Sequence, residues 1–368
     1  MKTQLLTLFV IFAAALAGIA WLSPAPDRVT DRAVYERTAD EFVVIDCADL
    51  HCFRVLVPWL LGPIPASSLA KWKAYAVVAN AAAAIAVLVL SLAWALPRRA
   101  AVIAATLSAF GFGSLYTLHD VFTSDPLMFA VGPLLVWLLI GERFAIAALA
   151  ASIGVLAKEF AAAPVYVFAA ASMLQRRMPQ AWRALAAANC ALIAWLLLQF
   201  TLMLRFNYGY GDNPSTHLMS GGYLAKWLSE QSARGAATAM FNEFGVLWLL
   251  APIGWLLAPP AMRVFALASI PVALVFGYVQ QPDRALWNFH FVVTPLSAIV
   301  LARLPQAAAW TIVAMFAFAN LRVGAQLPFV PAARVALALS VIVATGAMAW
   351  SWFTGRFTIA AQRQAASA

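Results

Sequence analysis

Residues 27–58 read DRVTDRAVYERTADEFVVIDCADLHCFRVLVP and separate two strongly apolar regions of the chain. The apolar regions decide the fold, and the polar segment between them indicates where chemistry takes place. This segment holds seven of the fifteen acidic residues in the protein: Asp27, Asp31, Glu36, Asp40, Glu41, Asp46 and Asp49. A carboxylate-rich loop that the chain holds at a membrane surface from both sides is a candidate active site.

The composition is that of a polytopic membrane protein. Over 368 residues, 64% are hydrophobic and 11% are charged, whereas globular proteins have about 45–50% apolar and about 25% charged residues. A hydrocarbon core about 30 Å thick needs roughly 20 apolar residues per helix, and apolar runs recur from Leu5 to Phe353. We therefore predict an all-α fold with about twelve transmembrane helices (about 11–13) in one transmembrane domain, residues 1–368.

The predicted spans are 5–22, 72–96, 100–118, 126–140, 144–157, 160–174, 184–204, 239–258, 262–280, 287–302, 306–320 and 332–353. The first is interpreted as an uncleaved anchor, with a cleaved signal peptide as the alternative. No internal repeat or separate soluble domain is predicted.

The net charge of +9 predicts the orientation of the chain and does not indicate a nucleic-acid partner. If the amino terminus is cytoplasmic, the loops on that side carry one acid, Glu142, and eleven basic residues. The basic residues are Lys2, Arg98, Arg99, Arg143, Arg176, Arg177, Arg183, Arg263, Arg303, Arg356 and Arg363. The other side carries the remaining thirteen basic and fourteen acidic residues. This is the positive-inside pattern, so both termini are expected in the cytoplasm and the acidic loops outside.

Two outer loops, 23–71 and 205–238, are expected to carry the site and a lid. The sequence FRVLVPWLLGPIP at 53–65 is too short and too interrupted to span, which predicts a re-entrant or interfacial helix. Aromatic and basic residues from Lys71 to Tyr75 predict an interfacial belt that includes Trp72. In the second loop, apolar residues recur at helical spacing from Tyr223 to Leu228 and predict an amphipathic helix.

The outward side gathers the residues that could do chemistry. They are Asp31, Tyr35, Asp46, Asp49, His51 and Arg54 in the first loop, Asp120 and Asp125 in the next, Lys158 and Glu159 in a short turn, and Asp283 and Arg284 in a late loop. A charge at the hydrocarbon edge costs about 2.5–3.5 kcal/mol on insertion scales and is seldom kept without a partner or a task. Their concentration on one face is the functional signal.

Short motifs among these residues resemble those of bacterial integral-membrane glycosyltransferases of the GT-C superfamily. The motifs are Asp-x-x-x-Tyr at Asp31 and Tyr35, Phe-Arg-Val-Leu-x-Pro at 53–58, Ser-Asp-Pro at 124–126, Lys-Glu at 158–159 and Asp-Arg at 283–284. The resemblance implies a multi-span fold, a catalytic carboxylate in the first outer loop and a polyprenyl-phosphate-linked sugar as donor. Asp31-Arg32 stands where the family has Asp-Gly, and the large soluble carboxy-terminal domain of some members is not expected within these residues.

Transfer of a sugar from a lipid phosphate needs a base for the acceptor proton and cations for the leaving phosphate. Asp31 is the first candidate for the base, with Asp46 and Asp49 as alternatives. Lys158 and Arg54 are expected to bind the phosphate. The remaining expectations are that Asp125 and Glu159 orient the acceptor or the lysine, and that Asp283 and Arg284 close the cavity. Tyr35, His51 and Asp120 are further candidates for binding the substrate.

Plainer roles remain open for several of these residues. Asp125, which precedes a proline, is also a candidate helix cap, and Lys158 with Glu159 is a candidate structural pair in a tight turn. Arg54 and Arg284 are also candidates for snorkelling to lipid headgroups.

Cys47 and Cys52 lie where an oxidising compartment permits a disulfide, but the sequence alone does not decide whether one forms. Their spacing with His51 matches no zinc pattern, so no metal ligand is assigned, and dependence on a divalent cation is left open.

The sequence predicts a bacterial inner-membrane enzyme that transfers a hexosyl or pentosyl group, with membrane lipid as a partner. It leaves the sugar, the acceptor and the oligomeric state open. Two other classes compete with this interpretation: a secondary transporter and a flippase for lipid-linked sugars. A transporter would carry charged or broken helices near the bilayer midplane, whereas these charges cluster at one face.

Overall fold

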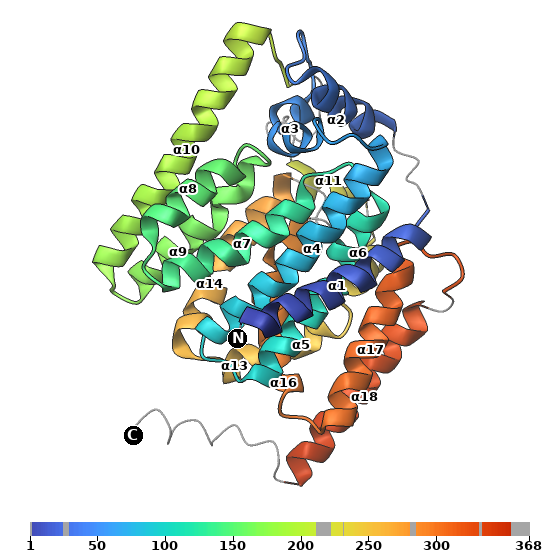
Figure 1. The fold of residues 1–368 in the computed structure, drawn as a ribbon. Helices are drawn as coiled ribbons and strands as arrows, with labels where there is room; N and C mark the ends of the chain where they lie inside the picture. The colour runs from blue at the N-terminus through green and yellow to red at the C-terminus, as the bar shows by residue number, and fades with distance from the viewer. Residues whose placement is uncertain are drawn as a thin grey trace.

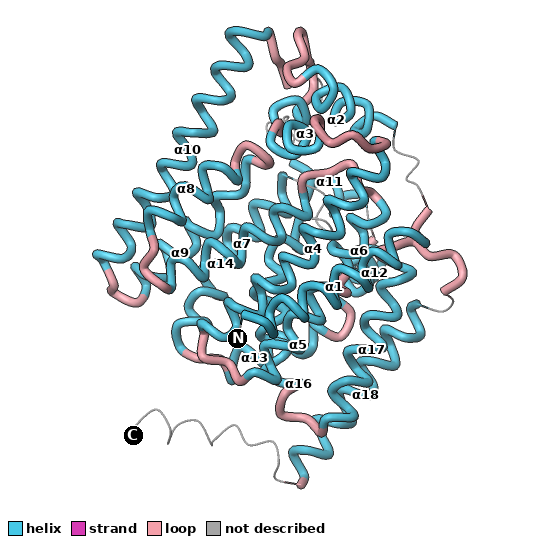
Figure 2. Tube along the Cα trace, in the orientation of Figure 1, coloured by secondary structure: helices cyan, strands magenta, loops and turns pink. Residues whose placement is uncertain are grey.

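Helices make up nearly all the regular structure of the computed structural model, which describes residues 2–24, 29–210, 222–230, 232–279, 285–330 and 333–354 (Figures 1 and 2). They are α1 (Lys2–Leu22), α2 (Val29–Glu41), η1 (Leu50–Phe53), α3 (Leu56–Leu61), α4 (Ser68–Ala93), α5 (Arg98–Ala109), α6 (Phe112–His119), α7 (Asp125–Ile140), α8 (Phe144–Gly154), η2 (Glu159–Ala162), α9 (Ala163–Leu174), α10 (Met178–Phe206), α11 (Gly222–Glu230), α12 (Ala233–Phe244), α13 (Leu247–Leu257), α14 (Pro260–Val279), η5 (Trp287–Phe289), α16 (His290–Leu301), α17 (Gln306–Val323) and α18 (Ala333–Phe353).

The lengths of these helices define a multi-pass membrane protein. Within the described ranges, seven helices are long and apolar enough to cross a bilayer: α1, α4, the α5–α6 pair, α10, α14, α17 and α18. Five shorter apolar helices are α7, α8, η2 with α9, α13, and η5 with α16. Each of these segments overlaps one predicted span, which confirms the all-α membrane fold, while the number that cross stays a prediction.

Two predicted spans are each divided into two helices. The segment 100–118 holds α5 and α6, which meet where the Trp287 ring fills the space in which Gly111 and Gly113 would carry a side chain. The segment 239–258 is also two helices, since Gly245 has a left-handed φ of +49° that ends α12. Residues Arg98–His119 together are still one candidate membrane span, whereas within 239–258 only Leu247–Leu257 is an apolar helix of the predicted kind.

The acidic segment after α1 is more ordered than the loop that the sequence predicts. Residues Val29–Glu41 form α2, although the segment has no apolar stripe along one face. Ion pairs between residues four apart, Arg32 with Glu36 and Arg37 with Glu41, each at 3.0 Å, support this helix. The short helix predicted after the loop is present as α3.

Small residues bring the helices of the core close together. Helix α4 packs against α7, α5 and α1, and its alanines Ala76, Ala81 and Ala84 are fully buried. Helix α13 packs against α16, where Gly254 meets the backbone carbonyl of Leu296 too closely for any side chain. The interfaces are formed by van der Waals contacts at short interhelical distances, as in other membrane bundles.

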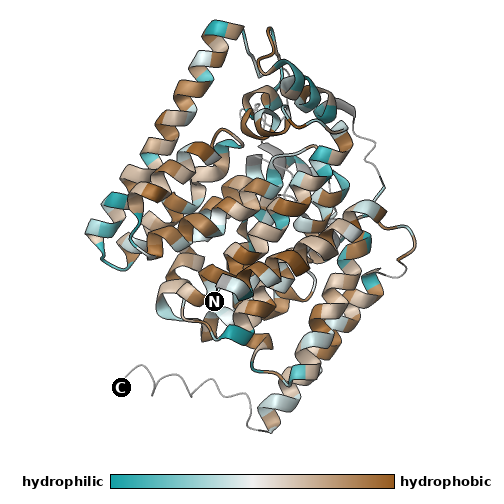
Figure 3. Cartoon of the chain, in the orientation of Figure 1, coloured by the Kyte–Doolittle hydropathy of each residue, from teal (hydrophilic) through white to brown (hydrophobic). Residues whose placement is uncertain are grey.

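Polar residues gather at one end of the bundle, which we call the α2 end and define by α2, η1, the start of α7 and the α8–α9 turn. Figure 3 shows hydrophilic residues on α2 and at the upper end of α10, with apolar helices below them. The predicted amphipathic helix of the second loop is present as α11, which packs against α14. Residues 211–221, which precede α11, lie outside the described residues.

Candidate functional site

A short 3₁₀ helix, η1, carries the polar residues of the first loop. The Asp49 carboxylate caps it by accepting a hydrogen bond of 2.7 Å from the His51 backbone N–H. The same oxygen also lies 2.7 Å from His51 Nδ1. Burial raises the pKa of Asp49, but the hydrogen bonds and charge of His51 and the charge of Arg54 bring the pKa below its ordinary value. Asp49 therefore carries a negative charge beside an oriented imidazole.

A disulfide and the end of α10 hold η1 in place. Cys47 and Cys52 are joined, which answers a question that the sequence left open. The Cys47 carbonyl accepts a hydrogen bond of 2.8 Å from the Gly209 N–H, and the Asp46 carboxylate accepts one of 2.7 Å from Asn207 Nδ2. These contacts tie Asp46 to the end of α10, whereas the catalytic role predicted for it stays a prediction.

Arg54 connects η1 to the α8–α9 turn. Its guanidinium donates to both oxygens of Glu159, from Nη2 at 2.7 Å and from Nε at 3.2 Å. The Leu56 N–H also donates to the Leu156 carbonyl at 3.0 Å. Burial lowers the pKa of Arg54, but Glu159 raises it above its ordinary value, so the guanidinium stays charged. The bidentate geometry fixes the orientation of the fork.

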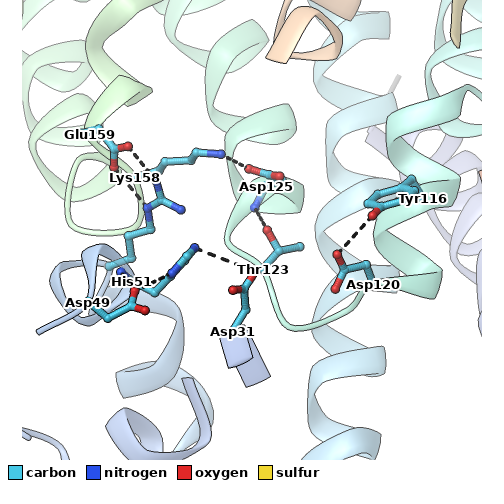
Figure 4. Close-up of polar contacts among 10 residues, drawn as sticks. Asp31, Asp49, His51, Tyr116, Asp120, Thr123, Asp125, Lys158 and Glu159 are labelled. Carbon is cyan, nitrogen blue, oxygen red and sulfur yellow. Dashed lines mark hydrogen bonds and ion pairs between the residues drawn. The ribbon is translucent and has the colours of Figure 1, made fainter. Parts of the chain in front are cut away.

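Lys158 connects the same turn to the start of α7. Its Nζ donates to Asp125 Oδ1, and each of the two side chains is only 7% exposed. Figure 4 shows Lys158 reaching Asp125 from the turn that also carries Glu159. Ser124 stands at the N-cap position, and Asp125 is the first residue of α7. The Asp125 carboxylate therefore pairs with a buried cation, which favours the ion-pair role over the cap role.

Asp31 and Tyr35 lie one turn apart on α2 and both face His51. Asp31 Oδ2 is 4.0 Å from His51 Nε2, and the Tyr35 ring meets the imidazole edge to face, with 5.6 Å between ring centroids. Burial raises the pKa of the Tyr35 hydroxyl to about 12. Tyr35 also packs on Trp72 at 5.3 Å. Figure 4 shows the contact between Asp31 and His51 as a dashed line.

Asp120 lies at the flank of this group, at the end of α6. The Tyr116 hydroxyl donates to Asp120 Oδ2 at 3.4 Å, and the carboxylate is buried. In Figure 4 the pair lies on the far side of Thr123 from Lys158. Asp283 and Arg284, which were expected to close the cavity, lie outside the described residues.

The α2 end thus gathers predicted residues from three distant segments. These are Asp31, Tyr35, Asp49, His51 and Arg54 from the first loop, Asp125 from the start of α7, and Lys158 and Glu159 from the α8–α9 turn. Within the described ranges, no group of three or more His, Cys, Asp or Glu side chains is arranged to hold a metal ion.

Sequence reasoning missed the aromatic support of the site. Trp72 is fully buried and contacts Tyr35, Tyr75 and Phe122, so its assignment to an interfacial belt was wrong. The Tyr75 hydroxyl accepts a hydrogen bond of 3.2 Å from the Leu127 N–H in the first turn of α7. The sequence pattern of an aromatic residue near a span end is the same whether the residue lies at the membrane interface or is buried in the bundle. Only tertiary packing distinguishes the two locations.

An apolar cavity of about 490 Å³ opens between α13, α14 and α16. Its lining includes Trp248, Trp255, Leu274, Phe289 and Leu296. Ring contacts lead from it towards the ion pairs: Phe289 meets Phe276 at 5.3 Å, and Phe276 meets Phe160 at 4.4 Å. Because Phe160 follows Glu159 directly in the chain, one wall of the cavity is connected to the α8–α9 turn.

The fold and the site therefore describe an all-α multi-pass membrane protein with paired charges at one end of its bundle. No protein-family model matches the chain, and no curated protein matches it. Solved structures of the oligosaccharyltransferase of Archaeoglobus fulgidus do share its fold. The apo form aligns with a TM-score of 0.52 at 14% identity, over 94% of this chain and 56% of that one.

A second structure of that protein, AglB in complex with an inhibitory peptide and a dolichol-phosphate, aligns with a TM-score of 0.55 at 14% identity, over 92% of this chain. The chain spans 56% of the length of these solved structures. At this identity the likeness shows a shared fold.

Proposed function

We propose that this protein is a membrane glycosyltransferase that moves a sugar from a polyprenyl-phosphate carrier to an acceptor at the outer face of a bacterial inner membrane. The observation that carries the proposal is a set of two ion pairs, the buried pair of Lys158 with Asp125 and the part-buried pair of Arg54 with Glu159. Keeping two cations side by side at a membrane boundary is costly. The leaving phosphate gains negative charge during the reaction, and both cations would stabilise that charge.

In the proposed reaction, the acceptor O–H or N–H loses its proton to Asp31 while its heavy atom attacks the anomeric carbon. The bond from that carbon to the phosphate oxygen breaks, and the electron pair leaves with the phosphate. Arg54 and Lys158 stabilise the charge that develops there. Asp31 is preferred over Asp46 and Asp49 because the other two carboxylates already accept short hydrogen bonds from Asn207 and His51.

Asp125 and Glu159 balance the two cations before the donor binds, so the four side chains carry no net formal charge. The carboxylates also hold the cations in a fixed geometry, which lowers the reorganisation needed during transfer. Because a phosphate diester carries one negative charge, it binds here by competing with these carboxylates for the same donors.

The apolar cavity between α13, α14 and α16 is the proposed site for the prenyl chain. Its lining is almost entirely hydrophobic, and the Phe289–Phe276–Phe160 contacts connect it to the turn that carries Lys158. A lipid-linked donor needs this combination, a charged site beside an apolar groove. The charged residues lie at helix ends and not within helices, which favours a transferase over a transporter.

The test compares lipid extracts and surface glycans of a host strain that carries the wild type, Asp31→Asn or Asp40→Asn in place of its own copy. Asp40→Asn is the matched control, because Asp40 is an exposed residue of the same helix. We expect Asp31→Asn to accumulate a polyprenyl-phosphate sugar and to lose a glycan, with Asp40→Asn like the wild type. Unchanged lipids and glycans in Asp31→Asn would contradict the proposal.

A further inference from the structure

The imidazole of His51 lies between two carboxylates, one from its own helix and one from α2. Its Nδ1 is 2.7 Å from Asp49 Oδ1, and its Nε2 is 4.0 Å from Asp31 Oδ2. The His51 side chain is 16% exposed, and the Tyr35 ring packs against the imidazole. The ring is therefore oriented by its hydrogen bond at Nδ1 and by the packing of Tyr35, with Nε2 on the side of Asp31.

The contact with Asp49 determines which ring nitrogen carries the proton. An ionised carboxylate has only acceptor oxygens, so the short contact at Nδ1 requires an Nδ1–H. The lone pair of the neutral ring then lies on Nε2, the nitrogen that faces Asp31. Asp49 itself is fixed, because it also accepts from the His51 backbone N–H as the cap of η1.

We propose that Asp49 and His51 form a proton relay behind Asp31, the base of the proposed transfer reaction. The inference rests on that proposed function. In the relay, Asp31 takes the proton from the acceptor and then passes it to His51 Nε2 through one bridging water, because the two atoms are 4.0 Å apart. The resulting imidazolium lies between the Asp49 and Asp31 carboxylates, and its Nε2–H returns the proton to solvent through the same bridging water, which restores the neutral ring with its proton on Nδ1. His51 acts through Asp31 and is a positioning and relay residue.

The disulfide and the α10 contacts give this arrangement a fixed frame. Cys47 and Cys52 bracket Asp49 and His51, and Arg54, the next charged residue, is held by Glu159. The side chains that contact His51 are thus Asp31 and Tyr35 from α2 and Asp49 from its own segment, and the charge of Arg54 acts on Asp49.

The first test reads the tautomer of His51 and does not depend on any substrate. The protein, with its four histidines labelled with nitrogen-15, is placed in nanodiscs, and the His51 signals are assigned by their loss in His51→Gln. We expect a protonated Nδ1 and an unprotonated Nε2 in the neutral ring. A neutral ring with its proton on Nε2 would overturn the relay, because that nitrogen would have no lone pair to accept a proton.

The second test uses the lipid extract of the Asp31→Asn strain as the source of the donor lipid. Each protein is added to this extract, and the release of polyprenyl phosphate is measured. We expect His51→Gln, which keeps an N–H for Asp49, to lower the rate about 10- to 100-fold at unchanged KM for the donor lipid. We also expect added imidazole to restore part of the rate in His51→Ala. If the wild type is active, two results would refute the relay: full activity of His51→Gln, or a loss of activity in His51→Ala that added imidazole does not restore. An inactive wild type would instead refute the proposed function, and the tautomer would still decide the relay geometry.

Discussion

Removing one charge of the Lys158–Asp125 pair should destabilise the fold more than removing both. Each side chain is 7% exposed, so either residue left alone is a buried charge that has lost its nearest partner. Such single removals cost about 3–5 kcal/mol. We therefore expect Asp125→Asn and Lys158→Met to lower the free energy of unfolding by about that amount each. The double variant should lose only about 1–2 kcal/mol, because its buried amide is polar but uncharged.

The measurement is equilibrium unfolding of the four proteins in mixed detergent micelles, analysed as a double-mutant cycle. The control is the Arg37–Glu41 pair, which has a contact of 3.0 Å but side chains that are 54% and 48% exposed. Arg37→Met should cost no more than about 0.5 kcal/mol. Losses below about 1 kcal/mol in both single variants, or a double variant that loses the sum of the two, would refute the claim that the pair is buried and coupled.

Other changes test the parts of the structure around the pair. Replacing both Cys47 and Cys52 by serine should lower the free energy of unfolding by about 2 kcal/mol, the value for closure of a short loop, and reductant should do the same to the wild type alone. Gly111→Ala should cost about 1–3 kcal/mol in the same unfolding assay, since its new methyl group meets the Trp287 ring; an unchanged stability would contradict that contact. Ala273→Phe, which fills part of the apolar cavity, should weaken binding of labelled undecaprenyl phosphate at least about tenfold with little change in stability, and unaltered binding would exclude this cavity as the prenyl site.

Much of the site could be predicted because its residues are unusual where they stand. A lysine beside a glutamate in a turn between short apolar segments, or an acidic run between apolar regions, stands out against the composition of a membrane protein. Lys158, Glu159 and Arg54 were therefore identified individually from the sequence. Their pairing was not, because Arg54 and Glu159 are 105 residues apart and nothing in either local pattern specifies the other.

The remaining differences have similar causes. Helix α2 has no apolar stripe, so periodicity could not identify it, and pairs such as Arg32–Glu36 support it instead. Trp72 has the composition of an interfacial belt but lies buried under Tyr35. The break at Gly245 follows from a left-handed backbone, which a glycine permits but does not require. In each case tertiary packing selects among conformations that the local sequence leaves open.

The proposed phosphate site is tested most directly by the binding of undecaprenyl phosphate, measured by native mass spectrometry, to a double variant, Arg54→Gln with Glu159→Gln. This variant removes a cation without leaving its carboxylate buried and unpaired, and Arg37→Gln with Glu41→Gln is the matched control. We expect the Arg54 double variant to bind the lipid at least about tenfold more weakly, with the control like the wild type. Equal binding by the wild type and the Arg54 double variant would contradict a phosphate site at the α2 end.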